Sequence, residues 1–359
     1  MKLKATFLAT TALLTAGNAL AADVTVYGQV NKLAVSADNG VETNTAIVDN
    51  DSSSSRFGFK AQQQLDSGLV VSALLELQSE SNSSASISFE DDESNEENNS
   101  GISERHSRVG LSGTYGTFLI GKTSEATDGI SEMDLGGVSD VMYAGIGNIG
   151  AGINFVKKSD GTSTTKSVGD MYSNFGGGRT NLVRYDTPAL AGVNGSVSVS
   201  SGGDIAVATK YSGKIDRFKV KAGLGLKKHE NGEVTGGKII DQDVSGSVSV
   251  LCTESGVGLT VAMGERSYES SENRKDGEFL YTKLSYLPVG SNFEYAVDYA
   301  EAESVSADNE EISTYGAGVQ YNLAKGVSTS LMYRQLEADK LADDAEDIKL
   351  ISAGLKVKF

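Results

Sequence analysis

The chain of 359 residues is poor in the residue types that stabilise small secreted folds or join domains. It has one Cys, two Pro and no Trp. A single cysteine, Cys252, excludes an internal disulfide framework, so the fold must be stable without one. Two prolines exclude a Pro-rich linker, and one residue pattern recurs from position 24 to position 359. The sequence therefore predicts one domain.

Positive charge and long apolar runs are also scarce. With 31 Lys and Arg against 48 Asp and Glu, the formal net charge is −17, which argues against nucleic-acid binding. After residue 21 there is no run of about 18 apolar residues, which excludes a transmembrane helix. Membrane β-barrels also lack such runs, because their lipid-facing and lumen-facing residues alternate.

The first 21 residues have the composition of an export signal. Lys2 and Lys4 precede a short apolar stretch, and Ala19-Leu20-Ala21 supplies small residues where cleavage is expected. We expect residues 1–21 to be a signal peptide and residues 22–359 to form the mature domain.

The chain is rich in segments where apolar and polar side chains alternate with a period of two. NGSVSVS places Val197 and Val199 on one face and serines on the other, and AGLKVKF ends the chain in the same way at Phe359. This period is that of a β-strand with one face against an apolar medium. The other face carries mainly Ser, Gly, Lys, Asp and Arg, which fits a water-filled barrel interior.

The connections between these segments alternate between short turns and longer, mostly acidic loops. We expect sixteen strands, at residues 24–36, 55–64, 69–78, 103–113, 117–122, 179–187, 192–200, 204–212, 217–227, 241–251, 257–268, 277–287, 292–301, 311–323, 327–337 and 347–359. The predicted fold is all-β: a 16-stranded antiparallel transmembrane β-barrel, wide enough to hold an aqueous channel. The last strand must pair with the first, because an open edge in hydrocarbon is too costly. Phe359 would then join an aromatic girdle with Tyr286 and Tyr321.

Six segments, in this order, carry a resemblance to a known family: ADVTVYGQVN, SSRFGFK, RVGLSGTYGTFLIGK, ATDGISEMDL, RYDTPALAG and the terminal Phe359. Together they span the mature chain, which resembles the general, non-specific porins of the Gram-negative outer membrane. The resemblance implies a homotrimer of barrels that pass small hydrophilic solutes and ions, with a third loop folded into each pore. It also implies that the outer-membrane assembly machinery recognises the terminal strand. The proline- and glutamate-containing loop-tip motif of the enteric members is absent.

One connection, residues 123–178, is much longer than the others, and such loops are usually functional or disordered. Its first part contains the acidic residues Glu125, Asp128, Glu132, Asp134 and Asp140. If the loop folds inward as in the resembling family, these carboxylates lie at the constriction, where fixed negative charge favours cations. Weak cation selectivity is the resulting expectation, and a solvated surface loop is the alternative.

Basic residues are expected on the wall opposite this loop. Strand parity places four of them inward: Arg56, Lys60, Arg108 and Arg184. Parity is ambiguous for Arg179, which resembles a wall arginine of the porin family by its FGGGR context. Acids facing bases across a narrow gap would orient dipolar solutes. Arg105, on the outward parity, is expected to extend to the membrane interface, and His106 to face the lumen.

The sequence predicts no enzyme, and no catalytic, metal or cofactor site. GIGNIG, residues 145–150, formally matches a dinucleotide motif but lies in the long loop without the required strand–turn–helix context. His106 and His229 lack metal-ligand spacing, and the acidic run 90–99 lacks EF-hand spacing. That run is expected to be a solvated loop near lipopolysaccharide. A Ser–His hydrolase is not excluded by spacing alone. The sequence is also compatible with a substrate-specific channel and with a surface β-sheet adhesin that has no pore.

Overall fold

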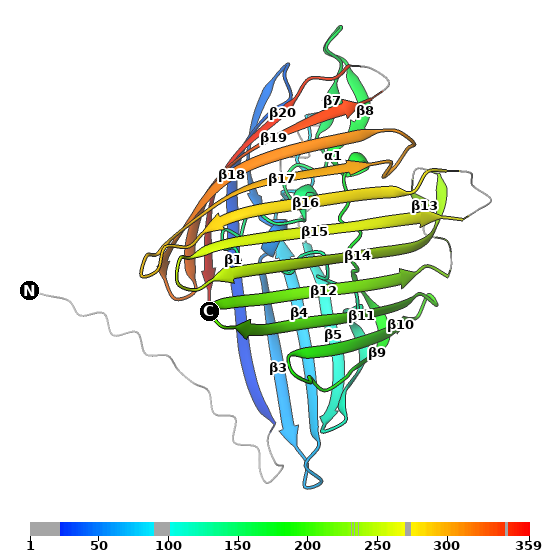
Figure 1. Ribbon diagram of the computed structural model, residues 1–359, viewed down its shortest axis with the longest axis vertical. Helices are drawn as coiled ribbons and strands as arrows, with labels where there is room; N and C mark the ends of the chain where they lie inside the picture. Colours follow the sequence, from blue (N-terminus) through cyan, green and yellow to red (C-terminus); the bar gives the residue numbers. More distant parts are fainter. Residues whose placement is uncertain are drawn as a thin grey trace, which may run out of the picture.

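The computed structural model describes residues 22–89, 101–230, 232, 234–235, 237–269, 274–341 and 344–359. In these residues one antiparallel sheet curls into a closed barrel (Figure 1). Each wall strand pairs with the next, except that β2 and β3 both pair with β1 (Asp23–Asp38). β1 also pairs with β20 (Ile348–Lys358), which closes the cylinder. The other wall strands are β2 (Thr43–Asp49), β3 (Arg56–Gln64), β4 (Val70–Glu80), β5 (Gly101–Gly113), β6 (Gly116–Ser124), β9 (Arg179–Asp186), β10 (Val193–Ser200), β11 (Ile205–Ile215), β12 (Phe218–Lys228), β14 (Lys238–Cys252), β15 (Val257–Tyr268), β16 (Gly277–Tyr286), β17 (Phe293–Glu303), β18 (Glu311–Ala324) and β19 (Val327–Lys340).

The predicted count of sixteen strands is confirmed, because β2 and β3 share one position in the wall. β2 pairs with the half of β1 from Lys32 to Asp38, and β3 pairs with the half from Asp23 to Gln29. Each predicted strand lies within three residues of an observed strand at either end. β2 itself was wrongly placed in a loop. The strand is short and ends at Asp49. The next residue, Asn50, accepts a hydrogen bond from the Ser52 backbone in a turn that interrupts pairing.

The remaining regular structure of the described residues is short and lies in the connections. It consists of η1 (Asp51–Ser53), η2 (Ile146–Asn148), α1 (Val168–Met171), the hairpin of β7 (Asn154–Val156) and β8 (Ser163–Ser167), and β13 (Val234–Thr235). No helix in the described ranges is long and apolar enough to cross a membrane. The predicted signal peptide and the acidic run 90–99 lie outside the described residues.

The barrel is closed by the last residue of the chain. The backbone N–H of Phe359 donates to the carbonyl oxygen of Gly28, and the N–H of Gly28 donates back, both at 3.0 Å. A side chain at Gly28 would not fit, because a Cβ atom there would lie 2.6 Å from the Phe359 ring. The ring is 69% exposed on the outer surface. Tyr286 and Tyr321 lie at the same short-turn edge, and Tyr321 contacts Phe293 with ring centroids 4.5 Å apart. Aromatic side chains thus gather at this edge, and their role as a membrane-interface girdle stays a prediction.

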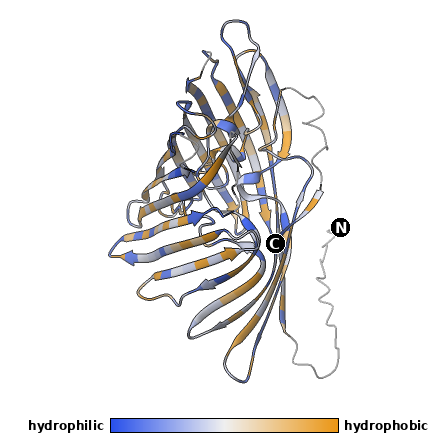
Figure 2. Ribbon diagram, turned by 90° about the vertical axis from the view of Figure 1, so that its right-hand side faces the viewer, coloured by the Kyte–Doolittle hydropathy of each residue, from blue (hydrophilic) through white to orange (hydrophobic). Residues whose placement is uncertain are grey.

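Side-chain polarity differs between the two ends of the barrel, although hydropathy alternates along the strands (Figure 2). Toward the short turns, apolar side chains point outward as predicted: Val197 is 37% exposed and the inward Ser198 only 2%. Toward the long loops the pattern reverses on β1 and on β16 to β20. There Leu33 and Val35 point inward and are buried, while Lys32 lies on the outer face. The strands therefore continue beyond the apolar band at the long-loop end.

Replacing Gly28 by Ala is expected to destabilise the barrel. The new methyl group would meet both the Phe359 ring and, at 2.8 Å, the carbonyl oxygen of Arg56, which the sheet holds in place. We expect a loss of about 1–3 kcal/mol, typical of overpacking, measured by urea unfolding in detergent. Gly101→Ala is the matched control, because a Cβ atom there has no neighbour within 4 Å. Equal stability of the two variants would contradict this account of closure.

Candidate functional site

The connection between β6 and β9, residues 125–178, lies inside the barrel, as predicted for the third loop. We call it the inner loop. Three of its backbone N–H groups donate to inward-facing serine hydroxyls of the wall: Ala126 to Ser198 (2.9 Å), Met133 to Ser247 (3.1 Å) and Leu135 to Ser249 (2.9 Å). These serines belong to the polar faces of the NGSVSVS and DVSGSVSV segments. The small polar face of the wall strands therefore binds the loop backbone.

The inner loop packs directly on strand backbone where the wall has glycine. A Cβ atom at Gly223 on β12 would lie 2.7 Å from the Met133 sulfur and 3.1 Å from Cδ1 of Ile130. The backbone of β12 is therefore accessible to loop side chains only because this inward position lacks a side chain of its own.

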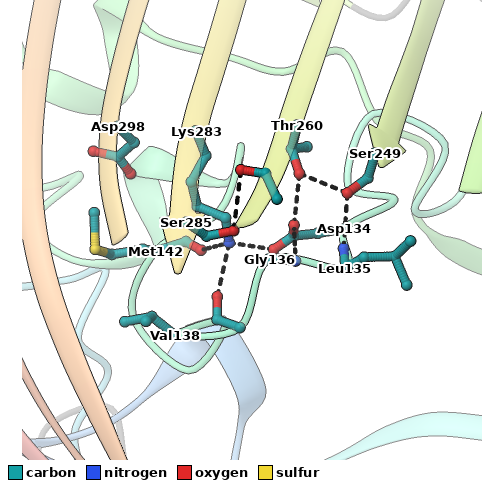
Figure 3. Close-up of polar contacts among 12 residues, drawn as sticks. Asp134, Leu135, Gly136, Val138, Met142, Ser249, Thr260, Lys283, Ser285 and Asp298 are labelled. Atoms are coloured by element: carbon teal, nitrogen blue, oxygen red, sulfur yellow. Dashed lines mark hydrogen bonds and ion pairs between the residues drawn. The ribbon is translucent and has the colours of Figure 1, made fainter. Parts of the chain in front are cut away.

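Lys283 on β16 is the most buried anchor of the inner loop (Figure 3). Its ammonium group forms an ion pair with Asp134 and donates to the carbonyl oxygens of Gly137 at 2.8 Å and Met142 at 3.0 Å. Thr260 on β15 donates to the same Asp134 carboxylate at 2.7 Å. One wall lysine thus satisfies three acceptors from a nine-residue stretch of the loop, residues 134–142.

Two further acids of the loop are paired with wall lysines. Asp140 forms an ion pair with Lys356 on β20 and accepts a hydrogen bond from Ser328 at 2.9 Å. Glu125 lies 3.3 Å from the ammonium group of Lys227 on β12. Together with Asp134, these carboxylates hold the loop against the wall. Their negative charge is balanced at short range.

The last two predicted acids have different environments. Asp128 lies 3.6 Å from Arg179, the one ion pair in the described residues that joins a predicted acid to a predicted wall base. The Glu132 carboxylate accepts a hydrogen bond from Asn174 at 2.8 Å. Burial inside the folded loop raises the pKa of Glu132 above its ordinary value, because the charged form of the carboxylate loses contact with water.

The predicted basic residues of the wall face the lumen. Four of them have a partner, whereas Arg108 forms no ion pair within the described residues. Arg56 lies 3.8 Å from Glu76, and the Lys60 ammonium group lies 4.2 Å from the centre of the Tyr27 ring. Arg184 forms an ion pair with Asp186 at 2.9 Å. It also donates to the carbonyl oxygens of Ser124 and Glu125, at 3.0 and 2.9 Å, and so supports the start of the inner loop.

Arg105 was expected on the outer surface, and this expectation is wrong. Its guanidinium group donates to Glu76 at 2.9 Å and to Gln78 at 2.6 Å, both on the inward face of β4. The cause is a β-bulge: Glu76 pairs with His106 and Leu77 with Glu104, so Arg105 is an extra residue in β5. A bulge shifts the parity of the residues that follow, which strict alternation cannot reveal. His106 faces inward as expected, with Nδ1 3.0 Å from the Thr123 hydroxyl.

One side of the interior is apolar. Side chains of the inner loop between residues 138 and 175 form a single buried cluster with inward residues of the wall: Leu33, Val35, Phe279, Tyr281, Ile312, Met332, Leu336, Ile348 and Leu350. These wall residues belong to β1 and β16 to β20. Polar inward residues extend around the rest of the wall and also occur on this side, as the buried Asp298–Arg334 ion pair shows. A polar cavity of about 450 Å³ lies beneath the loop beside Lys356.

Sequence reasoning missed the lysines that anchor the loop. Lys227, Lys283 and Lys356 all lie on inward parities that the alternation does predict. The same parity argument that placed Arg56 and Lys60 inward would therefore have identified these lysines. No group of three or more His, Cys, Asp or Glu in the described ranges is arranged to hold a metal ion.

Replacing Lys283 by Met is expected to loosen the inner loop. The substitution leaves the buried Asp134 carboxylate and two carbonyl oxygens without their donor, a change that costs about 3–5 kcal/mol when a buried ion pair is broken. Faster proteolysis between residues 134 and 142 of the folded protein in detergent would report the loosening. Lys228→Met is the control, because the Lys228–Asp241 pair is exposed and contributes about 0–1 kcal/mol. Equal protection in the two variants would contradict the anchoring role.

Comparisons with known proteins agree with this architecture. The profile of the Gram-negative porin family matches residues 8–341. The anion-selective porin from Comamonas acidovorans has a similar fold, with a TM-score of 0.64 and 17% identity over 94% of this chain and 100% of that one.

Two other solved structures also match over 94% of this chain. OmpT of Vibrio cholerae, in its trimer form, matches with a TM-score of 0.59 and 15% identity over 100% of its length. OmpF of Salmonella typhi, in complex with daunomycin, matches with a TM-score of 0.58 and 15% identity over 97% of its length. A comparison with curated proteins finds no significant match. The family profile spans most of the chain, and the protein therefore belongs to the Gram-negative porins, outer-membrane channels built on this barrel.

Proposed function

We propose that this porin is a passive diffusion channel for small hydrophilic solutes and ions. The observation that carries the proposal is a loop anchored by buried ion pairs across an interior whose other side stays polar. The anchors Asp134–Lys283 and Asp140–Lys356 hold the loop across the lumen, and the polar inward faces of β3 to β5 lie beside it. A lumen narrowed by a rigid loop and lined by charged groups admits small polar solutes and rejects large apolar ones.

Weak cation selectivity, the expectation from the sequence, has little support in these contacts. It depended on unpaired carboxylates at the constriction, whereas Glu125, Asp134 and Asp140 are each paired with a lysine. A paired acid contributes little net field to a passing ion.

The proposal includes the setting in which the channel works. A homotrimer is supported by the resemblance to porins and by the trimer form of OmpT from Vibrio cholerae. The composition of residues 1–21 supports export through a signal peptide. We also propose that the terminal strand ending in Phe359 is read by the outer-membrane assembly machinery, and that the outer surface contacts lipid and lipopolysaccharide.

Purified protein added to a planar lipid bilayer should produce large, stepwise increases in conductance that depend linearly on voltage at low potential. The physical reason is that water-filled pores conduct ions in proportion to the driving force. Protein unfolded by heat in detergent is the control and should produce no steps.

Swelling of liposomes in solutions of small sugars distinguishes general diffusion from the competing functions. General diffusion predicts swelling rates that fall smoothly with solute size. Saturation by one solute would favour a substrate-specific channel instead. Absence of both swelling and conductance from folded protein would contradict the proposal and favour an adhesin.

A further inference from the structure

The strands β11 and β12 carry four lysines on their inward faces, below the inner loop and toward the short turns. They are Lys210, Lys214, Lys219 and Lys221. Their inward orientation follows from the outward neighbours: Ile215 is exposed on the outer surface, and so are Phe218 and Leu224. Lys214 and Lys219 flank the turn that joins the two strands, so the series begins at the rim of the barrel.

Two of these lysines face each other directly. Lys214 on β11 and Lys219 on β12 are register partners, which brings their Cβ atoms to about 4.5–5.5 Å. Like charges at directly opposite positions are destabilising. Both side chains are exposed, and the next inward position of β12 adds Lys221. Such a group of cations is relieved by mobile anions in the water beside it.

The series of lysines leads to the inner loop. The Lys210 ammonium group lies 3.4 Å from the carbonyl oxygen of Asp128. Arg184 contacts the loop nearby and lies close enough to both Lys210 and Arg108 to affect them electrostatically. Arg108 on β5 and Lys60 on β3 add inward positive charge farther along the wall.

These cations are not balanced by local acids. Within the part of the chain that the structure describes, no ion pair is formed by Lys60, Arg108, Lys210, Lys214, Lys219 or Lys221. The acids that act electrostatically on Lys210 and Arg108, namely Asp128 and Asp186, are already paired with Arg179 and Arg184. The remaining field along this side of the lumen is therefore positive.

The acidity of the chain as a whole does not oppose this field. Many acids of the described barrel lie on the outer face at the long-loop end, where they alternate with buried inward residues: Glu301, Glu303, Glu311, Glu337 and Asp339. The barrel wall separates them from the lumen, and over more than about 10 Å salt screens such charges.

We propose that the lumen between the short-turn rim and the inner loop is an anion pathway, in which these lysines and Arg184 guide small anions, such as chloride, phosphate and carboxylates. This inference rests on the proposed channel function and adds its substrate class. The anions move by diffusion alone, so no covalent step is involved.

The reversal potential of single channels in a KCl gradient tests the proposal with the full-length protein. We expect chloride to permeate at least about twofold better than potassium, because unpaired cations line the path. Potassium phosphate gradients should give a reversal potential of the same sign. A reversal potential that shows preferential permeation of potassium would overturn the anion pathway and leave the channel function intact. Absence of any steps would instead overturn the channel function on which the inference rests.

The double variant Lys214→Gln/Lys219→Gln identifies the residues responsible. Both side chains are exposed and repel each other, so their removal is compatible with folding, and we expect the chloride-to-potassium ratio to fall by roughly half. The matched control Lys228→Gln/Lys349→Gln removes the same charge from the outer face and should leave the ratio unchanged. An unchanged ratio in the inward variant, or an equal fall in the control, would overturn the assignment to β11 and β12.

Discussion

The structure depends on one constraint: a backbone in hydrocarbon has no water to bond to. Each N–H and C=O group of the wall must therefore find its partner in a neighbouring strand, and only a closed cylinder supplies a partner to every strand. The pairing of β1 with β20 meets this requirement up to the last residue, where Phe359 and Gly28 exchange both of their backbone hydrogen bonds. This closure also requires glycine at position 28, because the Phe359 ring occupies the space that a side chain there would need.

The inner loop imposes a second requirement, which side chains of the wall meet. A long loop inside a barrel has backbone groups that must be satisfied away from bulk water. The inward serines accept loop N–H groups, and Lys283 donates to loop carbonyl oxygens as well as to Asp134. A buried ion pair adds little stability by itself, because desolvation offsets attraction. Its effect here is to specify one position of the loop, since any displacement would leave a charge and several polar groups unpaired.

Most of the wall could be predicted from the sequence because strand alternation is a local property. Residues such as Ser198 and Arg184 were assigned to the correct face from their immediate neighbours alone. Arg105 shows the limit of that method, since one bulged residue between β4 and β5 reverses the assignment and leaves no local mark. The pairing of Asp140 with Lys356 joins residues 216 positions apart, and no sequence pattern specifies such a contact. The apolar interior near Leu33 and Leu350 was also missed. These side chains point inward because the inner loop covers them, and the sequence does not show where that loop packs.

Because side-chain polarity reverses along the barrel, the net charge of the chain differs in sign from the charge that lines the lumen near the short turns. Beyond the apolar band, the outer face meets water and carries carboxylates, while the inner face packs against the loop. Nearer the short turns the outer face is apolar, so charged residues of the strands can be solvated only inside. Lysines such as Lys219 and Lys221 therefore concentrate in the lumen at the level of the apolar band. A net charge of −17 averages over both zones, whereas a permeating ion responds to the groups within about 10 Å of its path. The sign of that local field follows from strand parity and ion pairing, and composition alone does not determine it.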